Sequence, residues 1–323
     1  MLEIDQPEPG RSVKATTGFS ASPSDSAIPI KGRMSLGKAR IAALAAALLF
    51  STGGAGIKTG AFSAAQVSCV RSGIAAIVLL AWWRFRPRSG SGSGSGSQLG
   101  AILGIGAIYG TVLTLFVVST KLTTAANAIF LQATAPLYIL ALSPWLLRER
   151  VTRRDVGYMA VLAVGLALCF AGQQTASSIA TNPSLGNALA VICSVSWAFT
   201  LIALRWAQRG ERDIGVPAVI AGNFLASTAA LPFAWPFPDA GGGEWGTLIY
   251  LGVVQIGVAY ICLTTAMRTL PALEVSLLLL LEPVLNPMWT WLVRGEAPGQ
   301  WVIAGGALII GATAVQGIIA SRE

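Results

Sequence analysis

Long stretches without a charged residue follow one another after about residue 40, and short segments between them carry most of the charges. A helix needs about 20 mostly apolar residues to cross a bilayer. The stretch Val156–Leu204 is long enough for two such helices, which the polar segment Gln173–Asn187 separates. The pattern therefore predicts an all-α integral membrane protein with ten transmembrane helices. We place them at residues 40–58, 65–83, 98–118, 124–147, 155–172, 185–205, 214–235, 245–267, 273–293 and 300–320.

The chain contains an internal repeat. Residues 98–150 recur at 245–297 without a gap, so that Pro136 aligns with Pro283. Ten helices divide into two sets of five, and an odd number makes the second set enter the membrane from the opposite side. We therefore expect two inverted five-helix repeats around a central cavity. Transporters are commonly built in this way, with the substrate site near the middle of the membrane.

The repeat also predicts the domain organisation. Residues 1–39 are polar and rich in Pro, Ser and Thr, which is typical of a disordered tail rather than a signal peptide. The two repeats are expected at residues 40–172 and 185–320. In the segment Ser89–Ser97, serine and glycine alternate strictly, and this composition is typical of a flexible linker.

Composition and charge agree with a membrane protein and give it an orientation. Charged residues make up 11% of the chain, against roughly 25% in soluble domains, and the mean hydropathy is +0.67. The basic residues gather in the segments that lie on one side if both termini are cytoplasmic. These are Arg11, Lys14, Lys31, Arg33, Lys38, Arg40, Arg84, Arg86, Arg88, Arg148, Arg150, Arg153, Arg154, Arg205, Arg209, Arg212, Arg268 and Arg322. The net charge of +8 is thus explained by topology, and no nucleic-acid partner is expected.

The residues that most soluble enzymes use are missing from this sequence. It has no histidine and no phosphate-binding glycine loop, and its four cysteines lie inside predicted spans without a CxxC motif. We expect no cofactor, no metal and no catalytic residues. A membrane-embedded lipid enzyme is the less favoured alternative, because paired catalytic groups are not found.

Glu282 is the clearest acidic residue inside a predicted span. A carboxylate within a membrane is costly and points by default to function. Asn286 and Trp289 follow one and two turns later, so the three share one helix face, which we expect to line a cavity. Proton coupling through Glu282 is a possible role. Alternatively, Glu282 lies near the cytoplasmic end, where water reaches it, and merely caps a helix or pairs with Arg268.

Pro136 and Pro283 stand at matching positions in the two repeats. Proline frees a backbone carbonyl and kinks a helix, and paired helix interruptions point to a binding site. Gln132 precedes Pro136 by one turn and is the polar residue on that face, whereas Ala135 stands where Glu282 stands. The simpler alternative is that membrane helices merely tolerate these prolines.

Several polar and aromatic residues fall in the middle of predicted spans. They are Tyr109, Gln255 and Tyr260, with Ser196 and Trp197 in the sixth span. Because aromatic residues normally gather at membrane interfaces, we count these five as candidate cavity residues. They can equally be packing residues whose hydroxyl groups are hydrogen-bonded.

Three cations lie within or at the ends of predicted spans. Arg71 falls inside the second span, and Lys58 and Lys121 lie near the outer ends of theirs. One of them could hold a substrate carboxylate. The interpretation we favour is that each contacts lipid phosphate or a neighbouring carbonyl.

Small residues form ridges on the fifth and tenth spans. Ala163, Ala167 and Ala171 make one ridge, and Ala307 with Gly311 makes another. Such ridges let helices approach closely. We expect these two spans to hold the two halves together or to form a homodimer contact.

A doubled motif resembles one known family. In each half a proline helix leads to an acidic residue in a loop and then to a glycine-rich helix. The first copy is Ala135-Pro136, Arg148-Glu149-Arg150, Gly157 and Gly165, and the second is Leu281-Glu282-Pro283, Arg294-Gly295-Glu296, Gly305, Gly306 and Gly311. Over about residues 40–320 the chain resembles the EamA-type members of the drug/metabolite transporter superfamily.

This resemblance implies ten helices around a cavity that opens alternately to each side, with walls from helices 1, 3, 4, 6, 8 and 9. It also implies export of small metabolites across a bacterial inner membrane. We predict a neutral amino-acid exporter similar to the aromatic amino-acid exporters, acting as a monomer or homodimer. A cationic-drug exporter, with Glu282 and Trp289 as its binding groups, and a nucleoside exporter are the alternatives.

Overall fold

The computed structural model describes residues 34–58, 61–86, 96–123, 125–148, 151–171, 181–208, 214–294 and 300–321. These residues form helices and connecting loops without a strand, which confirms the predicted all-helical class. The helices are α1 (Leu36–Ser51), α2 (Gly53–Lys58), α3 (Ala64–Phe85), α4 (Gly96–Leu122), α5 (Ala125–Gln132), α6 (Ala135–Leu146), α7 (Arg153–Ala171), α8 (Pro183–Ala207), α9 (Gly215–Ala234), α10 (Gly242–Tyr250), η2 (Leu251–Val258), α11 (Ala259–Met267), α12 (Ala272–Leu278), α13 (Leu281–Arg294) and α14 (Gln300–Ser321).

Six helices within these ranges are long and apolar enough to cross a membrane. They are Ala64–Phe85, Gln98–Leu122, Asn127–Leu146, Pro183–Ala207, Gly215–Ala234 and Gly242–Met267. Four further predicted spans also contain helices: the first contains α1 with α2, the fifth α7, the ninth α12 with α13, and the tenth α14. That these four spans cross a membrane stays a prediction. The predicted tail lies outside the described residues as far as Arg33, and α1 begins at Leu36 rather than at residue 40. The Ser-Gly run lies outside them up to residue 95, and its last residues begin α4.

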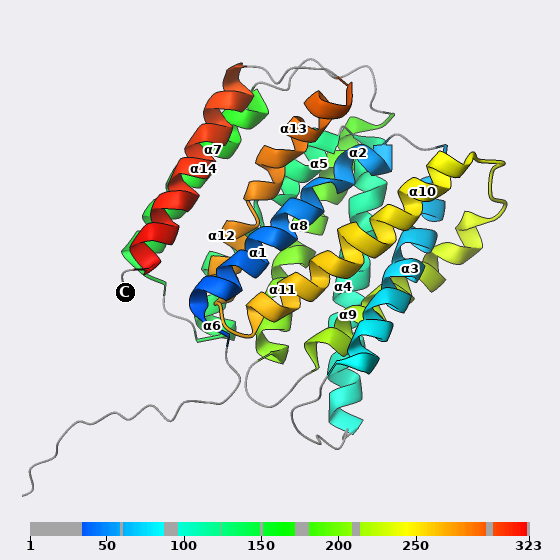
Figure 1. Cartoon of the computed structure of the whole chain (residues 1–323), viewed down its shortest axis with the longest axis horizontal. Helices are drawn as coiled ribbons and strands as arrows, with labels where there is room; N and C mark the ends of the chain where they lie inside the picture. Colours follow the sequence, from blue (N-terminus) through cyan, green and yellow to red (C-terminus); the bar gives the residue numbers. More distant parts are fainter. Residues whose placement is uncertain are drawn as a thin grey trace, which may run out of the picture. The chain divides into compact units, whose positions relative to one another are not determined.

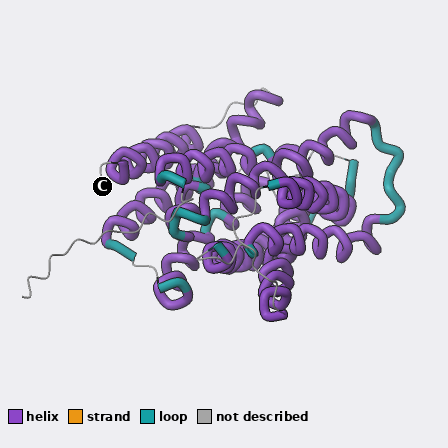
Figure 2. The backbone as a smooth tube through the Cα atoms, turned by 60° about the horizontal axis from the view of Figure 1, so that its bottom comes forward, coloured by secondary structure: helices purple, strands orange, loops and turns teal. Residues whose placement is uncertain are grey.

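Helices that are distant in sequence lie side by side (Figures 1 and 2). Helix α4 packs between α8 and α9, α3 packs on α9, and α1 packs on α11. The contact between α4 and α9 is close because both helices present glycine. A Cβ atom at position 222 would lie 2.6 Å from the carbonyl oxygen of Gly106, and one at position 110 would lie 3.0 Å from the carbonyl oxygen of Gly222. Only a residue without a side chain allows this approach.

Helices α7 and α14 pack against each other, but through residues other than those we expected. A Cβ atom at position 165 would lie 2.6 Å from Ile309 Cγ1, so Gly165 makes the close approach. The predicted ridges point outward. Ala163, Ala167, Ala171, Ala307 and Gly311 are all exposed. The two predicted spans thus do join the halves, but the ridges do not make this contact. The homodimer alternative stays a prediction.

The helix that contains Pro136 is interrupted just before the proline. Helix α5 ends at Gln132 and α6 begins at Ala135. Pro136 has no N–H to donate to the carbonyl of Gln132, and this carbonyl accepts a hydrogen bond from Ser194 Oγ at 3.1 Å instead. The side chain of α8 thus satisfies the group that the proline leaves free.

The second proline helix is interrupted at the corresponding place. Helix α12 ends at Leu278 and α13 begins at Leu281. The carbonyl of Leu279, to which Pro283 cannot donate, accepts the N–H of Glu282 at 2.9 Å. Both interruptions therefore lie within about one turn before the proline, and Glu282 is placed at the start of the new helix.

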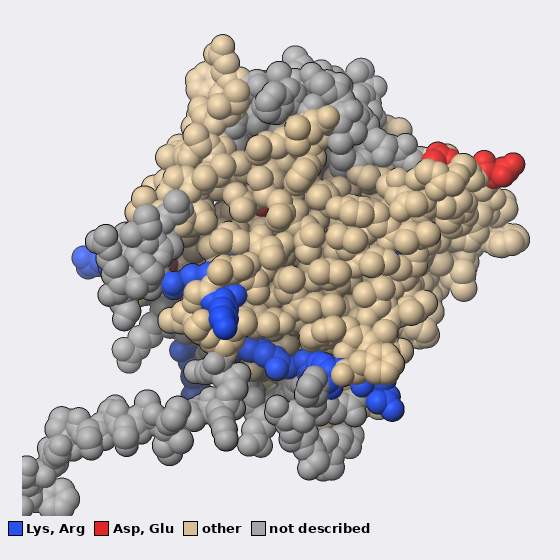
Figure 3. Space-filling view, in the orientation of Figure 1, with Lys and Arg blue, Asp and Glu red and all other residues tan. Residues whose placement is uncertain are grey.

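Many of the basic side chains gather at one end of the bundle. Figure 3 shows Lys and Arg gathered along its lower edge and acidic side chains at its upper right. Lys38 and Arg40 stand at the start of α1 and Arg84 at the end of α3, whereas Asp239 precedes α10 and Glu244 lies in its first turn. We call the end with Lys38, Arg40 and Arg84 the basic end.

Candidate functional site

A cavity lies between helices of both halves of the chain. Its volume is about 40 Å³, which is enough for a few water molecules and too small for an amino acid in this conformation. The lining residues are Phe50, Arg71, Val112, Leu113, Phe116, Gln132, Trp197, Gln255, Ile256, Tyr260 and Glu282. They come from the first, third, fourth, sixth, eighth and ninth predicted spans and, through Arg71, also from the second.

Five residues chosen from the sequence meet at this cavity. Gln132, Trp197, Gln255, Tyr260 and Glu282 all line it. The first comes from α5 in the first half, and the other four come from α8, η2, α11 and α13 in the second. The cavity is therefore built jointly by the two halves.

Tyr109 lies behind the cavity wall rather than in it. Its side chain is fully buried, and its ring centroid is 4.7 Å from that of Tyr260. Asn223 Nδ2 donates a hydrogen bond to its hydroxyl oxygen at 3.3 Å. Tyr109 thus packs against Tyr260 on the side away from the cavity lining.

The other predicted site residues also lie outside the lining. Asn286 is buried, and a Cβ atom on Gly54 would come within 2.7 Å of its Nδ2. Trp289 Nε1 donates a hydrogen bond to Ser51 Oγ at 2.8 Å. Ser196 is half-buried, and its backbone carbonyl accepts a bond from the Thr200 hydroxyl group. Asn286 and Trp289 therefore join α13 to α1 and α2.

Three aromatic rings form one wall of the cavity. Phe50 meets Tyr260 edge to face at 5.2 Å between ring centroids, and Trp197 lies 6.4 Å from Phe50 and 6.3 Å from Tyr260. Edge-to-face pairs hold aromatic rings in fixed orientations. The wall offers flat apolar surface at the place where polar groups also converge.

Arg71 was not placed in the predicted cavity, and the structure puts it there. Its side chain is 1% exposed. Nη1 donates to Gln255 Oε1 and Nη2 to the Leu113 carbonyl, both at 3.4 Å, and Nε has no partner. Burying a cation without a counter-ion costs several kcal/mol. The sequence signal was an arginine in an apolar span. We favoured a contact of Arg71 with lipid phosphate or a neighbouring carbonyl. The bond to the Leu113 carbonyl agrees with this interpretation, and the bond to Gln255 was not predicted.

Glu282 lines the same cavity from α13. Among the described residues, Arg40 and Glu274 make the one ion pair, and the carboxylate of Glu282 makes no hydrogen bond there. The alternative in which Glu282 pairs with Arg268 is therefore not seen. No nitrogen of Arg71 comes within 4.0 Å of a Glu282 oxygen either. A guanidinium group and a carboxyl group thus line one cavity without pairing.

Gln255 is carried by an unusual segment of backbone. Residues Leu251–Val258 form a π-helical stretch between α10 and α11. Such stretches are rare and are found frequently at functional sites. Gly252 lets this stretch approach α3 closely, since a Cβ atom there would lie 2.6 Å from Ile74 Cβ and 2.9 Å from the Arg71 carbonyl oxygen. Gln255 is thereby held beside Arg71.

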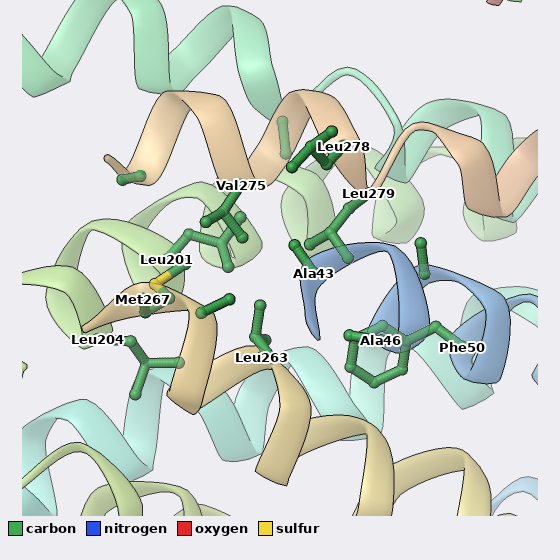
Figure 4. Packing of buried hydrophobic residues seen from close by; sticks show 14 of the residues in the cluster. Ala43, Ala46, Phe50, Leu201, Leu204, Leu263, Met267, Val275, Leu278 and Leu279 are labelled. Atoms are coloured by element: carbon green, nitrogen blue, oxygen red, sulfur yellow. The ribbon is translucent and has the colours of Figure 1, made fainter. Parts of the chain in front are cut away.

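An apolar layer packs between the cavity and the basic end, and Figure 4 shows its side chains. Its residues on α1, α8 and α11 lie one or two turns closer to the basic end than the cavity residues of those helices, two further residues come from α12, and all are buried. They are Ala43 and Ala46 of α1, Leu201 and Leu204 of α8, Leu263 and Met267 of α11, and Val275 and Leu278 of α12. We call this layer the apolar floor. Its buried side chains pack against one another in one apolar cluster.

An ion pair lies beyond the apolar floor and joins the first turns of α1 and α12. Arg40 Nε is 2.7 Å from Glu274 Oε1, and both side chains are partly exposed. Pairs of this kind contribute about 0.2–1 kcal/mol. We expect Arg40→Glu and Glu274→Arg each to lower the melting temperature of the detergent-solubilised protein slightly, because each variant places like charges together. The double variant should recover the loss. A double variant no more stable than either single one would contradict the pairing.

No group of three or more His, Cys, Asp or Glu side chains in the described ranges is arranged to hold a metal ion. The polar lining of the cavity consists instead of two charges and two amides. A cavity with such a lining, set among apolar helices from two related halves, is typical of a membrane transport protein.

The chain belongs to the EamA-like transporter family, whose model matches it twice, at residues 37–171 and 184–317. It is thus a transporter of the drug/metabolite superfamily and not an enzyme. The predicted resemblance is confirmed, and so is the two-repeat organisation.

Curated relatives agree with this assignment, and a solved structure shares the fold. The chain is 26% identical over 228 residues to the aromatic amino acid exporter YddG of Ancylobacter novellus. This alignment covers 68% of this chain and 76% of the relative. It is 23% identical to an uncharacterised transporter of Archaeoglobus fulgidus, over 69% of this chain and 76% of the relative. A crystal structure with 23% sequence identity superposes with a TM-score of 0.70 and covers 90% of this chain and 99% of its own.

Proposed function

We propose that this transporter exports neutral amino acids, with aromatic ones among its substrates. The cavity carries the proposal, because it combines an aromatic wall with one cation, one carboxylate and two amides. The aromatic wall suits an aromatic side chain, and the polar groups suit an amino acid's charged ends. The relative in Ancylobacter novellus, an aromatic amino acid exporter by name, supports the same substrate class.

Transport proceeds by alternating access in this proposal. Ten helices form two inverted five-helix repeats, at residues 40–172 and 185–320, which rock about the interruptions near Pro136 and Pro283. The apolar floor separates the cavity from the basic end, so this conformation represents a state closed on that side. Opening there requires α1 and α12 to move apart. Glu282 is the candidate proton carrier if transport is coupled.

The orientation belongs to the same proposal. With both termini in the cytoplasm of a bacterial cell, the basic end faces inward, as the positive-inside rule favours. The transporter then lies in the inner membrane, as a monomer or homodimer, with lipid around it. The apolar floor is on the cytoplasmic side of the cavity in this orientation.

A cationic-drug exporter is the second candidate, favoured by the carboxylate of Glu282 beside the aromatic wall. The cation of Arg71 in the same cavity argues against it, because a like charge repels the substrate. A nucleoside exporter has aromatic stacking in its favour but leaves both charges unpaired.

Uptake into proteoliposomes tests the substrate class. The panel contains labelled Phe, Trp, Thr, Met, a purine nucleoside and a quaternary cation, with protein-free vesicles as the control. We expect saturable, protein-dependent flux of amino acids, fastest for Phe and Trp. Flux of the cation or the nucleoside without flux of an amino acid would overturn the proposal. An imposed pH gradient then distinguishes proton exchange from uncoupled movement.

A further inference from the structure

Arg71 and Glu282 present opposite charges to one cavity from helices of different halves. Arg71 lies on α3 and Glu282 at the start of α13. Neither pairs with the other, and the Nε of Arg71 is buried without a partner. Both bonds that Arg71 does make are long and end on neutral oxygens. The cavity therefore holds a guanidinium group and a carboxyl group that form no ion pair with any of the described residues.

A ligand that neutralises both charges must carry an anion and a cation. A simple anion would satisfy Arg71 and be repelled by Glu282, and a simple cation would meet the reverse situation. Guanidinium groups bind carboxylates through two parallel hydrogen bonds, and a carboxylate accepts bonds from an ammonium group. The chemistry that fits is a zwitterion with a carboxylate and an ammonium group.

We propose that Arg71 binds the carboxylate of the substrate and Glu282 binds its ammonium group, so that the cavity selects free amino acids by both charges at once. The proposal rests on the amino-acid exporter function proposed above and assigns its recognition to two residues. The ring cluster of Phe50, Trp197 and Tyr260 lies in the same cavity and receives the side chain. Gln255 also lines the cavity, and its Oε1 accepts a hydrogen bond from Arg71.

A site with one binding group from each half is expected to close only on the complete substrate. The carboxylate attaches to α3 in the first half and the ammonium group to α13 in the second. A bound zwitterion therefore bridges the two halves, whereas a ligand with one charge engages one half only. The conformation described here has room for a few waters, so the cavity widens when a substrate enters.

The test compares three probes of one shape: L-phenylalanine, phenethylamine, which lacks the carboxylate, and 3-phenylpropionate, which lacks the amine. Their flux is measured in proteoliposomes at neutral pH. We expect the native protein to prefer phenylalanine over each analogue by at least about tenfold. This comparison needs no variant and cannot be affected by misfolding.

Two variants then invert the preference. Arg71→Gln should lose phenylalanine flux and gain phenethylamine flux, and Glu282→Gln should gain 3-phenylpropionate flux. A gain cannot come from a misfolded protein, and Arg71→Lys should keep part of the phenylalanine flux. Matched controls are Arg84→Gln, an exposed arginine of the same helix α3, and Asp239→Asn in an exposed loop. Both should behave as the native protein.

The outcomes separate this proposal from the one it rests on. If the native protein moves phenylalanine and both analogues equally, or if the variants reduce all three fluxes without inverting the preference, the two-charge recognition is wrong while the exporter function stands. If the native protein moves no amino acid, the exporter function itself is wrong.

Discussion

Replacing Gly252 by valine is expected to abolish transport. A Cβ atom at this position would lie 2.6 Å from Ile74 Cβ and 2.9 Å from the Arg71 carbonyl oxygen. A β-branched side chain and a backbone atom cannot move aside as a flexible chain end can. Valine must therefore push η2 away from α3, which separates Gln255 from Arg71 and deforms the cavity. Overpacking of this kind costs about 1–3 kcal/mol, and uptake should fall by roughly a hundredfold.

The matched control for this change lies on the same continuous helix. Gly246 is exposed, and a Cβ atom there would have no neighbour within 4 Å, so Gly246→Val should transport normally. Gly252→Ala should give an intermediate loss. Uptake of labelled phenylalanine and the melting temperature in detergent are the measurements. If valine at position 252 is tolerated as well as at 246, the contact between η2 and α3 does not hold the cavity together.

Replacing Pro283 by alanine is expected to slow transport by about tenfold or more while leaving the protein at least as stable. Alanine restores an N–H that can donate to the carbonyl of Leu279, which now accepts only from Glu282. A proline inside a helix costs about 3 kcal/mol, and its removal favours a continuous α12–α13 helix by a comparable amount. Straightening moves the Glu282 carboxylate from its place in the cavity and removes the interruption about which the halves rock.

The combination of slower transport and unchanged or higher melting temperature is the signature of a mechanical role. Pro232 offers a matched control, because it lies inside the uninterrupted helix α9 and is exposed. Pro232→Ala also adds an N–H, and it should not change uptake. Equal uptake by the native protein and the Pro283→Ala variant would contradict the rocking mechanism. Pro136→Ala should act in the same direction as Pro283→Ala, since the two interruptions occupy related places.

Five of the nine predicted site residues reach the cavity, and the reasons are physical. Gln132 and Glu282 flank helix interruptions that proline makes recognisable in a sequence. Tyr260, Gln255 and Trp197 are polar or aromatic residues in the middle of apolar spans, where burial in a polar cavity compensates their cost. Tyr109 shares these properties and yet lies one layer back, because helical periodicity gives a face but not a depth.

Arg71 lines the cavity although it was not among the predicted cavity residues. An arginine in an apolar span can reach lipid phosphate, a carbonyl or a cavity by bending its long side chain. Its sequence neighbourhood does not distinguish these possibilities. The packing of α3 against η2, through Gly252, decides that Arg71 faces Gln255 and the cavity. The ridges on α7 and α14 were misassigned for a related reason, since small residues permit close packing without specifying a partner.

The sequence by itself determined the class of this protein. Apolar runs of helical length predicted the helices, and the repeat at a constant offset predicted the duplication and its family. These signals are local or periodic, because the bilayer demands apolar residues and internally bonded backbone along every span. The tertiary structure alone decided which charges meet. Arg71 and Glu282 are 211 positions apart, and they face one cavity only because helices from both halves enclose it. Contacts between distant helices depend on the shapes of all their side chains together.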